Sequence, residues 1–291
     1  MRQQGNKNDF GMGGTRYTRN LLILGDALET LRKIDDECVQ CAVTSPPYWG
    51  LRDYGVEHQI GLEPSLEGFI DDLSRVFAEL HRVLKPDGTL WLNIGDTFTS
   101  GNRRYRATDR KNPARAMQIR PDTPDGLKRK DLIGVPWRLA LRLQSDGWYL
   151  RTDVIWHKPN AMPESVKDRP TRSHEYVFLL SKSEKYYYDW RAVAEENGRH
   201  LRSVWSINTR PYSGAHFATF PPDLVRPCIR ASTRPSDYVL DPFFGSGTVG
   251  EVCEQEGRRY VGIELNPEYR QLALRRMKTA PEVVAYGTGH V

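Results

Sequence analysis

The stretch 238–264 constrains the fold of this chain more than any other. A short apolar run, 238–240, leads directly into a glycine-rich turn, and a helical pattern follows over 249–256. A second apolar run, 259–263, ends at Glu264. The order strand, helix, strand argues for parallel pairing, because parallel neighbours need a long crossover connection. The pattern therefore predicts an α/β protein with a mostly parallel, twisted sheet and helices on both faces.

The turn Asp241-Pro242-Phe243-Phe244-Gly245-Ser246-Gly247-Thr248 has the composition of a ligand-binding loop. Its glycines let a ligand approach the backbone closely at the amino end of a helix. Glu264, at the tip of the next strand, is placed to accept hydrogen bonds from both ribose hydroxyls of an adenosine. A glycine-rich turn alone is a weak signal, and the acid at the next strand tip strengthens it.

The rest of the chain continues the alternation of strands and helices. Apolar runs predict strands at 21–24, 39–43, 89–94, 149–156 and 176–180. Helical spacing predicts helices at 66–84, 132–144 and 222–231, and Asn266-Pro267 caps a final one. We expect a single domain over 21–280, preceded by a mobile arm, 1–20, and followed by a tail, 281–291.

A second loop of fixed geometry, Thr44-Ser45-Pro46-Pro47-Tyr48, follows the strand 39–43. Consecutive prolines fix two φ angles and bias the residue before each toward extended geometry, so the Ser45 hydroxyl, a backbone carbonyl and the Tyr48 ring are held in set positions. Because open α/β sheets bind ligands at the carboxyl ends of their strands, the loop predicts a pocket for a flat, polar group. Taken alone, it is more typical of an ordinary proline-stiffened loop.

Asp26 follows the strand 21–24 in the turn Gly25-Asp26. A carboxylate at this position either points into the ligand crevice or caps the helix that follows, and the local sequence leaves both interpretations open.

Two of the four cysteines, Cys38 and Cys41, form a C-x-x-C pair, which is typical of half a zinc site or of a redox couple. Cys228 and Cys253 supply no second pair, and Cys41 lies inside an apolar strand. We therefore predict buried, reduced cysteines and no metal site.

The chain has a formal net charge of +5 and a pI near 9.0, and its basic residues cluster in one stretch, 101–130. This stretch has no periodicity, and we expect it to be a basic insertion. Its candidate DNA-binding residues are Arg103, Arg104, Arg106, Arg110 and Lys111. Such a run is typical either of a solvated face or of a loop that follows a phosphate backbone. The aromatic and basic segment 181–214 is a second candidate surface for target recognition, with a strand edge bearing surface tyrosines as the alternative.

No window of the chain approaches the length of apolar sequence that spans a membrane, and the polar start of the chain lacks the apolar centre of a secretory signal. We expect a soluble, cytoplasmic protein.

Together these motifs resemble those of the amino-methylating DNA methyltransferases that use S-adenosyl-L-methionine, in the subgroup whose catalytic motif precedes the cofactor motif. The matching residues are Thr44 to Tyr48, Asp241 to Thr248, Gly262 to Asn266 and Gly25-Asp26. The resemblance implies a Rossmann-like methyltransferase fold with a circularly permuted motif order, and double-stranded DNA as substrate. It also implies pairing as a homodimer, a cognate restriction endonuclease as a further partner, and a prokaryotic or phage-encoded protein.

The resemblance also implies roles for individual residues. Ser45, Pro46, Pro47 and Tyr48 would form the catalytic loop and face the target base. The cofactor-binding residues would be Asp26, Thr44, Phe220, Asp241, Pro242, Phe243, Gly245, Ser246, Gly247, Thr248, Glu264 and Asn266. Of these, Asp241, Phe243, Gly245 and Gly247 would border the methionine part, Glu264 would hold the ribose and Asp26 would lie near the adenine.

The target base follows from Ser45. In this family an aspartate at this position usually goes with adenine N6 and a serine more often with cytosine N4, so we expect cytosine-N4 methylation, with adenine-N6 methylation as the alternative. Methylation at cytosine C5 needs a cysteine nucleophile, and we interpret Cys228, in the only Pro-Cys pair, as a core residue. A DNA-binding protein that keeps the cofactor fold without turnover, or a methyltransferase for RNA or a protein amide, are more distant alternatives.

Overall fold

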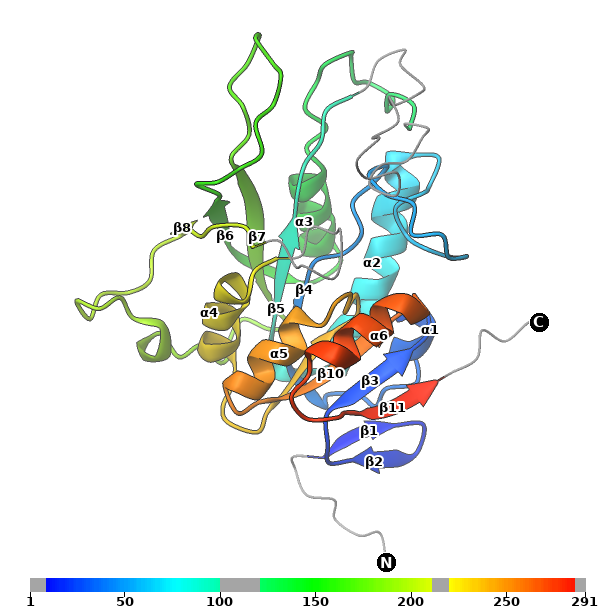
Figure 1. The fold of residues 1–291 in the computed structure, drawn as a ribbon, viewed down its shortest axis with the longest axis vertical. Coiled ribbons are helices and arrows are strands. Elements are labelled where there is room, and N and C mark those ends of the chain that lie inside the picture. The colour runs from blue at the N-terminus through cyan, green and yellow to red at the C-terminus, as the bar shows by residue number, and fades with distance from the viewer. Residues whose placement is uncertain (1–8, 100–120, 211–219, 286–291) are drawn as a thin grey trace, which may run out of the picture.

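The computed structural model describes residues 9–99, 121–210 and 220–285, and its centre is a nine-stranded sheet (Figure 1). The strand order is β11-β3-β10-β9-β4-β5-β7-β6-β8. These strands are β3 (Leu21–Leu24), β4 (Val39–Thr44), β5 (Leu84–Ile94), β6 (Tyr149–His157), β7 (His174–Ser181), β8 (Val204–Ser206), β9 (Tyr238–Asp241), β10 (Arg259–Glu264) and β11 (Glu282–Ala285). Neighbours are parallel except where β7 pairs with β5 and with β6. The predicted α/β fold with a mostly parallel sheet is confirmed.

The chain leaves the centre of the sheet in two directions. From β9 it passes through α5 (Thr248–Gln255) to β10, and from β4 it passes through α2 (Leu66–Val83) to β5 on the other side. β9 and β4 are themselves neighbours. Such a reversal opens a crevice at the carboxyl ends of the two strands, and ligands of open α/β sheets bind there. The two predicted loops, one after β4 and one after β9, therefore lie side by side.

Helices cover both faces of the sheet. α1 (Ala27–Leu31), α2 and α3 (Val135–Ser145) pack on one face, and α4 (Pro222–Ser232), α5 and α6 (Pro267–Arg276) pack on the other (Figure 1). Side chains of β9 alternate between the two cores, with Tyr238 and Leu240 on the α2 side and Val239 on the α5 side. Because both faces are buried, the central strands are nearly continuous apolar runs.

The helix ends follow from local chemistry. α2 begins after Ser65, whose Oγ accepts a hydrogen bond from the Gly68 backbone N–H at 3.1 Å. α3 begins at Val135 rather than at the predicted 132, because Gly134 takes a left-handed conformation with φ of 79°. Pro136 lies in the first turn of α3, where its missing N–H has no helical partner to lose.

Both ends of the described chain are more ordered than the sequence predicts. We expected 1–20 to be a mobile arm, but β1 (Phe10–Met12) and β2 (Thr15–Tyr17) form an antiparallel hairpin, and all of β1 is buried. The expected tail, 281–291, includes β11, which pairs in parallel with β3. These segments are too short to show a period in the sequence, and tertiary contacts decide their structure.

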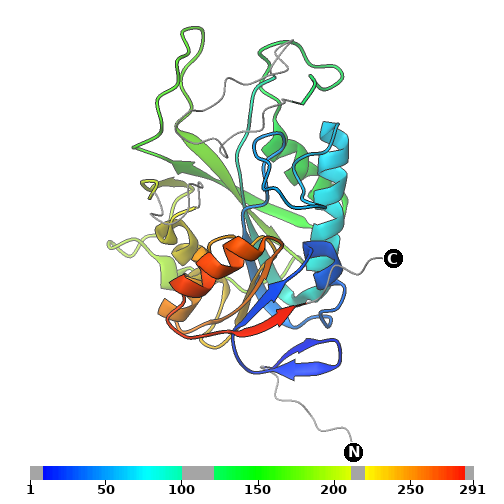
Figure 2. The ribbon, with the colours of Figure 1, turned by 45° about the vertical axis from the view of Figure 1, so that its right-hand side comes forward.

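The loop 158–173, between β6 and β7, rises at the end of the molecule opposite the β1-β2 hairpin (Figure 2). β6 runs antiparallel to β7, and β7 runs antiparallel to β5, so β6 ends at the same edge of the sheet as β4 and β9. The loop therefore begins beside the ligand crevice.

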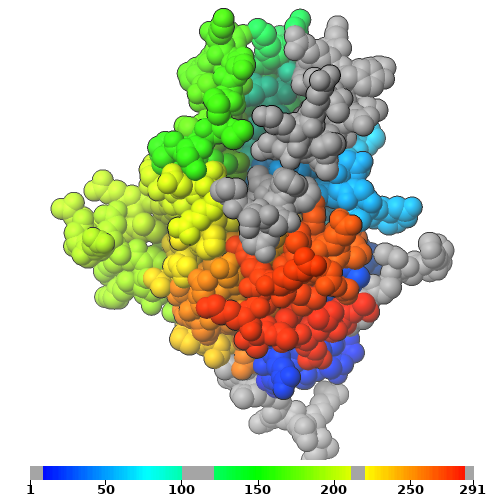
Figure 3. All heavy atoms as spheres, viewed as in Figure 1, coloured from blue at the N-terminus to red at the C-terminus, as the bar shows by residue number. Residues whose placement is uncertain are grey.

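The segment around the 3₁₀-helix Arg191–Val193 projects from the body beside α4, away from α2 (Figure 3). It belongs to the stretch 181–214, whose role in target recognition stays a prediction. No helix in the described part of the chain is long and apolar enough to cross a membrane.

Candidate active site

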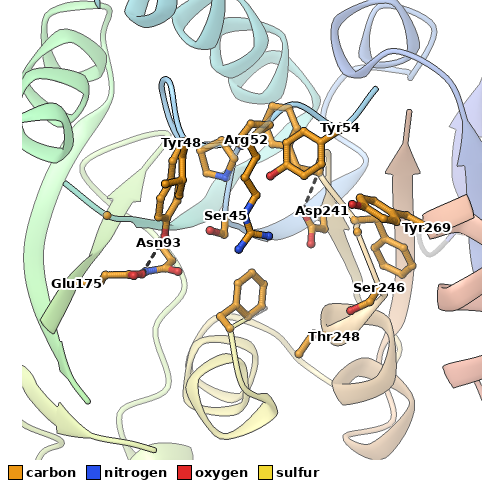
Figure 4. A pocket seen from close by; sticks show the side chains of 18 of the residues that line it. Ser45, Tyr48, Arg52, Tyr54, Asn93, Glu175, Asp241, Ser246, Thr248 and Tyr269 are labelled. Carbon is orange, nitrogen blue, oxygen red and sulfur yellow. Dashed lines mark hydrogen bonds between the residues drawn. The ribbon is translucent and has the colours of Figure 1, made fainter. Parts of the chain in front are cut away.

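The carboxyl ends of β4 and β9 border a cavity of about 1080 Å³. Figure 4 shows Ser45 and Tyr48 on one side of it and Asp241, Ser246 and Tyr269 on the other. The predicted site residues that line it are Asp26, Ser45, Pro46, Pro47, Tyr48, Phe220, Asp241, Pro242, Phe243, Gly245, Ser246, Thr248, Glu264 and Asn266. The fold thus brings two loops that are far apart in the sequence to one cavity.

A buried hydrogen bond joins the two loops. Thr44 Oγ1 donates to Asp241 Oδ1 at 2.6 Å, and the Phe243 backbone N–H donates to the same oxygen at 3.0 Å. Asp241 is almost completely buried, and burial raises the pKa of its carboxyl to about 7. Thr44, predicted to bind the cofactor, does not line the cavity and instead fixes the carboxylate that does.

Glu264 joins the turn after β9 to the turn after β10. Its Oε2 accepts from the Gly245 backbone N–H at 2.7 Å, and its Oε1 accepts from the Asn266 backbone N–H at 2.8 Å. Burial raises the pKa of this carboxyl to about 7, although both hydrogen bonds favour the charged form. Each oxygen keeps a lone pair that can accept a further hydrogen bond, as holding a ribose hydroxyl requires.

The two glycines of the turn, Gly245 and Gly247, are required for different reasons. Gly245 lines the cavity with φ of 53°, and a Cβ there would meet only the Phe243 carbonyl oxygen, at 3.9 Å. Gly247, also predicted to border the cofactor, does not line the cavity. It adopts φ of 83° at the start of α5, and a Cβ there would lie 2.7 Å from Met277 Cε. Gly247 therefore serves the packing of α5 against α6.

Asp26 combines the two roles that its sequence position allowed. Its carboxylate accepts from the Glu29 backbone N–H at 2.9 Å, so it caps α1, and it also lines the cavity. Phe220 lines the cavity just before α4, as predicted.

The Ser-Pro-Pro-Tyr loop holds its tyrosine through a carboxylate from another strand. Tyr48 Oη donates to Glu175 Oε2 at 2.8 Å, and burial, together with this carboxylate, raises the pKa of the phenol well above its usual value. A Cβ at Gly95 would lie 2.7 Å from Tyr48 Cε2, so only glycine leaves room for the ring. The ring is therefore held by packing on one side and by a hydrogen bond at its tip.

Several cavity residues were not predicted. Glu175 also accepts from Asn93 Nδ2 at 3.2 Å and forms an ion pair with Lys158. Figure 4 shows the Arg52 guanidinium pointing into the cavity between Ser45 and Asp241. The position of Asn93 near the carboxyl end of a predicted strand could have indicated a place in the cavity. The sequence around Glu175 and Arg52 gives no such indication.

The four cysteines are free, and three of them are buried as predicted. Cys41, Cys228 and Cys253 are buried, and Cys38 is partly buried, with its thiol directed at the Asp35 carbonyl at 3.1 Å. Cys228 lies within α4 and not on the cavity, so it is not placed as a nucleophile for C5 chemistry. The predicted DNA-binding residues Arg103, Arg104, Arg106, Arg110 and Lys111 lie outside the described residues.

The site fits S-adenosyl-L-methionine. Asp241 and Glu264 place two carboxylates at the tips of adjacent parallel strands, where a cation and a ribose can each be held, and Gly245 leaves the space between them open. Across the cavity lies a loop suited to a flat, polar group. A cavity between the ends of β4 and β9, with a cofactor side of this kind and a base side of this kind, is typical of the S-adenosyl-L-methionine-dependent amino-methyltransferases.

Comparisons with known proteins agree with this class. The family model of the N6/N4 DNA methylases matches residues 39–275, and the chain belongs to this family. It is 67% identical over 261 residues to the Type II methyltransferase M.Cfr9I of Citrobacter freundii, covering 88% of this chain and 87% of that protein.

Solved structures share the fold. The PvuII DNA methyltransferase, described as cytosine-N4-specific, matches with a TM-score of 0.70 and 24% identity over 90% of this chain and 88% of its own. A DNA modification methylase of Thermus thermophilus, complexed with S-adenosyl-L-methionine, matches with a TM-score of 0.64 and 26% identity over 92% of this chain and 100% of its own. The protein is thus a DNA methyltransferase that uses S-adenosyl-L-methionine.

Proposed function

We propose that this methyltransferase modifies the exocyclic N4 amine of cytosine. The observation that carries the proposal is Ser45, which stands in the catalytic loop where adenine-modifying relatives usually have an aspartate, and which lines the cavity beside Tyr48. Its neutral hydroxyl both accepts and donates hydrogen bonds, whereas an ionised carboxylate only accepts.

The loop residues act on the amine. Its lone pair is delocalised into the ring, which makes it a poor nucleophile. Hydrogen bonds from the amino group to Ser45 Oγ and to the Pro46 carbonyl oxygen would draw the nitrogen toward tetrahedral geometry and free the lone pair for attack on the donor's methyl group. The N–C bond would form as the bond between that methyl group and the donor sulfur breaks, and the amino nitrogen would then lose one proton. The ring of Tyr48 stacks on the base, which has to leave the duplex to enter the cavity. Positioning and preorganised dipoles supply most of the acceleration.

The residues across the cavity hold the methyl donor. S-adenosyl-L-methionine, when bound, supplies a methyl group on a positively charged sulfonium. Asp241, Phe243 and Gly245 would border its methionine part, Glu264 would accept hydrogen bonds from the ribose hydroxyls, and Asp26 would lie near the adenine. Because Thr44 and Asp241 are hydrogen bonded, the donor side and the acceptor side keep a fixed spacing.

The DNA contacts extend beyond the cavity. We assign phosphate contacts to the basic stretch 101–130 and base recognition to the segment 181–214, whose charge and aromatic content suit these roles. The type II relative supports a role in restriction and modification beside a cognate endonuclease in a prokaryotic cytoplasm. A homodimer is a further proposal.

The deciding experiment identifies the product. Purified protein is incubated with S-adenosyl-L-methionine and mixed-sequence duplex DNA, the DNA is digested to nucleosides, and the methylated species is identified by mass spectrometry. N4-methylcytosine is expected, and N6-methyladenine would overturn the choice of base. Ser45→Ala should abolish transfer while leaving cofactor binding intact, because Ser45 faces the base.

A further inference from the structure

A large apolar side chain stands exposed at the entrance of the active-site cavity. Met162 is 71% exposed, more than any other large apolar residue of the described chain, yet it lines the cavity together with Pro163. A residue that does both lies at the mouth. Single exposed hydrophobes are common on protein surfaces. One at the mouth of a cavity that receives a base is placed to contact the duplex that the base leaves.

The start of the Met162 loop is braced. Asn160 Nδ2 donates to the Thr209 carbonyl at 3.0 Å, and Asn160 Oδ1 accepts from the Thr209 backbone N–H at 2.8 Å. The Ala161 backbone N–H donates to the Lys158 carbonyl at 3.0 Å. Lys158 in turn pairs with Glu175, which holds Tyr48. The loop that carries Met162 is thus tied to the residue that would stack on the target base.

The far side of the loop is braced as well. Arg169 pairs with Glu164 at 2.7 Å, and its guanidinium lies 3.8 Å from the centre of the Phe98 ring. These contacts hold both arms of the loop, so the exposed tip is carried on a fixed support. A side chain on a fixed support loses less conformational freedom when it is inserted between bases.

We propose that Met162 enters the DNA helix as the target base leaves it and fills the space that the base vacates. Proteins that kink DNA insert apolar side chains, methionine, leucine and proline among them, between base steps, so a duplex can accept a wedge of this chemistry. The unbranched thioether of methionine adapts to an irregular gap and packs well on aromatic rings. The proposal rests on methylation of an extruded base, and it adds the residue that stabilises the opened duplex.

The test uses an oligonucleotide duplex that contains the methylated sequence, mapped first by sequencing of modified DNA. 2-Aminopurine next to the target base reports its extrusion through increased fluorescence. Met162→Ala should lower the fluorescence increase and reduce the single-turnover methylation rate about tenfold, because no side chain then occupies the space that the extruded base leaves in the duplex. On a duplex with a mismatch at the target base, which is already unpaired, Met162→Ala should methylate within about twofold of the wild type.

Two variants sharpen the result. Met162→Leu keeps an apolar wedge and should stay close to the wild type, and Leu141→Ala, which removes an exposed apolar side chain on α3 away from the cavity, should change nothing. Equal losses of Met162→Ala on matched and mismatched duplexes, or no loss on either, would overturn the proposal. A wild type that methylates the duplex without any fluorescence increase would also overturn it and would leave the methyltransferase assignment standing.

Discussion

Tyr48 Oη and Glu175 Oε2 are hydrogen bonded at 2.8 Å, so the last residue of the Ser-Pro-Pro-Tyr loop is held by the antiparallel strand β7. Glu175 is also bonded to Asn93 and paired with Lys158. Hydrogen bonds to charged groups are stronger than neutral ones. The Tyr48 ring is therefore held in place without a base, and a base that stacked on it, as we propose, would need no rearrangement of the ring.

Tyr48→Phe should separate the stacking of the ring from its orientation. The phenyl ring can still stack, but the hydrogen bond to Glu175 is lost. A bond to a charged group contributes about 1.5–3 kcal/mol, so we expect the single-turnover methylation rate to fall about tenfold or more. Cofactor affinity, measured by calorimetry, should change less than about twofold, because we assign Tyr48 to the target base and not to the cofactor.

Tyr149→Phe is the matched control, since Tyr149 is exposed on β6 and does not line the cavity. Tyr48→Ala, which removes the ring as well, should abolish transfer. A Tyr48→Phe enzyme with the wild-type rate would show that Glu175 does not orient the ring for catalysis.

Thr44→Val should weaken cofactor binding without touching the cavity wall. Valine matches threonine in shape, but Asp241 loses the 2.6 Å hydrogen bond that favours its charged form, so its pKa should rise further above about 7. A carboxyl that is neutral more often attracts a cationic ligand less. We expect the dissociation constant of S-adenosyl-L-methionine at pH 7 to increase about tenfold, the equivalent of one net hydrogen bond.

The control for this change is Thr152→Val, on the exposed edge of β6, which should leave the dissociation constant unchanged. If Thr44→Val bound the cofactor as well as the wild type, the Asp241 carboxylate would not depend on its threonine partner.

The stability of the cofactor-free protein should fall as the pH rises through neutrality. Asp241 and Glu264 both have a pKa of about 7 in the fold, raised by burial above their usual values. At a pH between their unfolded and folded pKa values, the folded state binds more protons than the unfolded state. The contribution of these two carboxyls to the free energy of unfolding is therefore complete below about pH 4 and is lost progressively as the pH rises to about 7. Each group contributes a slope of at most about 1.4 kcal/mol per pH unit to the free energy of unfolding.

Urea unfolding between pH 5 and 8 measures this slope. Asp241→Asn should reduce the pH slope of the free energy of unfolding by the contribution of one carboxyl. Asp53→Asn, in an exposed loop, should leave the slope unchanged. S-adenosyl-L-methionine should oppose the loss, because a bound cation favours the ionised carboxylates. A slope that Asp241→Asn leaves unaltered would assign the pH dependence to other groups.

The sequence predicts those parts of the site whose signals are local. The stiff Ser45 to Tyr48 loop, the glycine turn beginning at Asp241 and the acid at Glu264 each follow an apolar strand directly, and the sheet brings the ends of parallel strands together. Their meeting at one cavity therefore follows from strand order alone.

The parts that the sequence does not predict depend on pairing between distant strands. Glu175 reaches Tyr48 only because β7 runs back beside β5, and nothing near Glu175 in the sequence indicates that. Thr44 and Gly247 belong to recognisable motifs, but only the packing shows that they support the cavity from behind. The β1-β2 hairpin is equally a product of tertiary burial.

Replacing Arg103, Arg104 and Arg106 with alanine should weaken DNA binding at low salt and flatten its salt dependence. Each phosphate contact releases counterions, so the loss of three contacts should reduce the slope of log K against log salt by about 3. The control, Arg32→Ala with Arg75→Ala and Arg142→Ala, removes the same charge from exposed positions just after α1 and on α2 and α3. Fluorescence anisotropy between low and physiological salt gives both slopes. If the two triple variants changed the slope equally, the effect would come from net charge, and the basic stretch 101–130 would not be the surface that follows the DNA backbone.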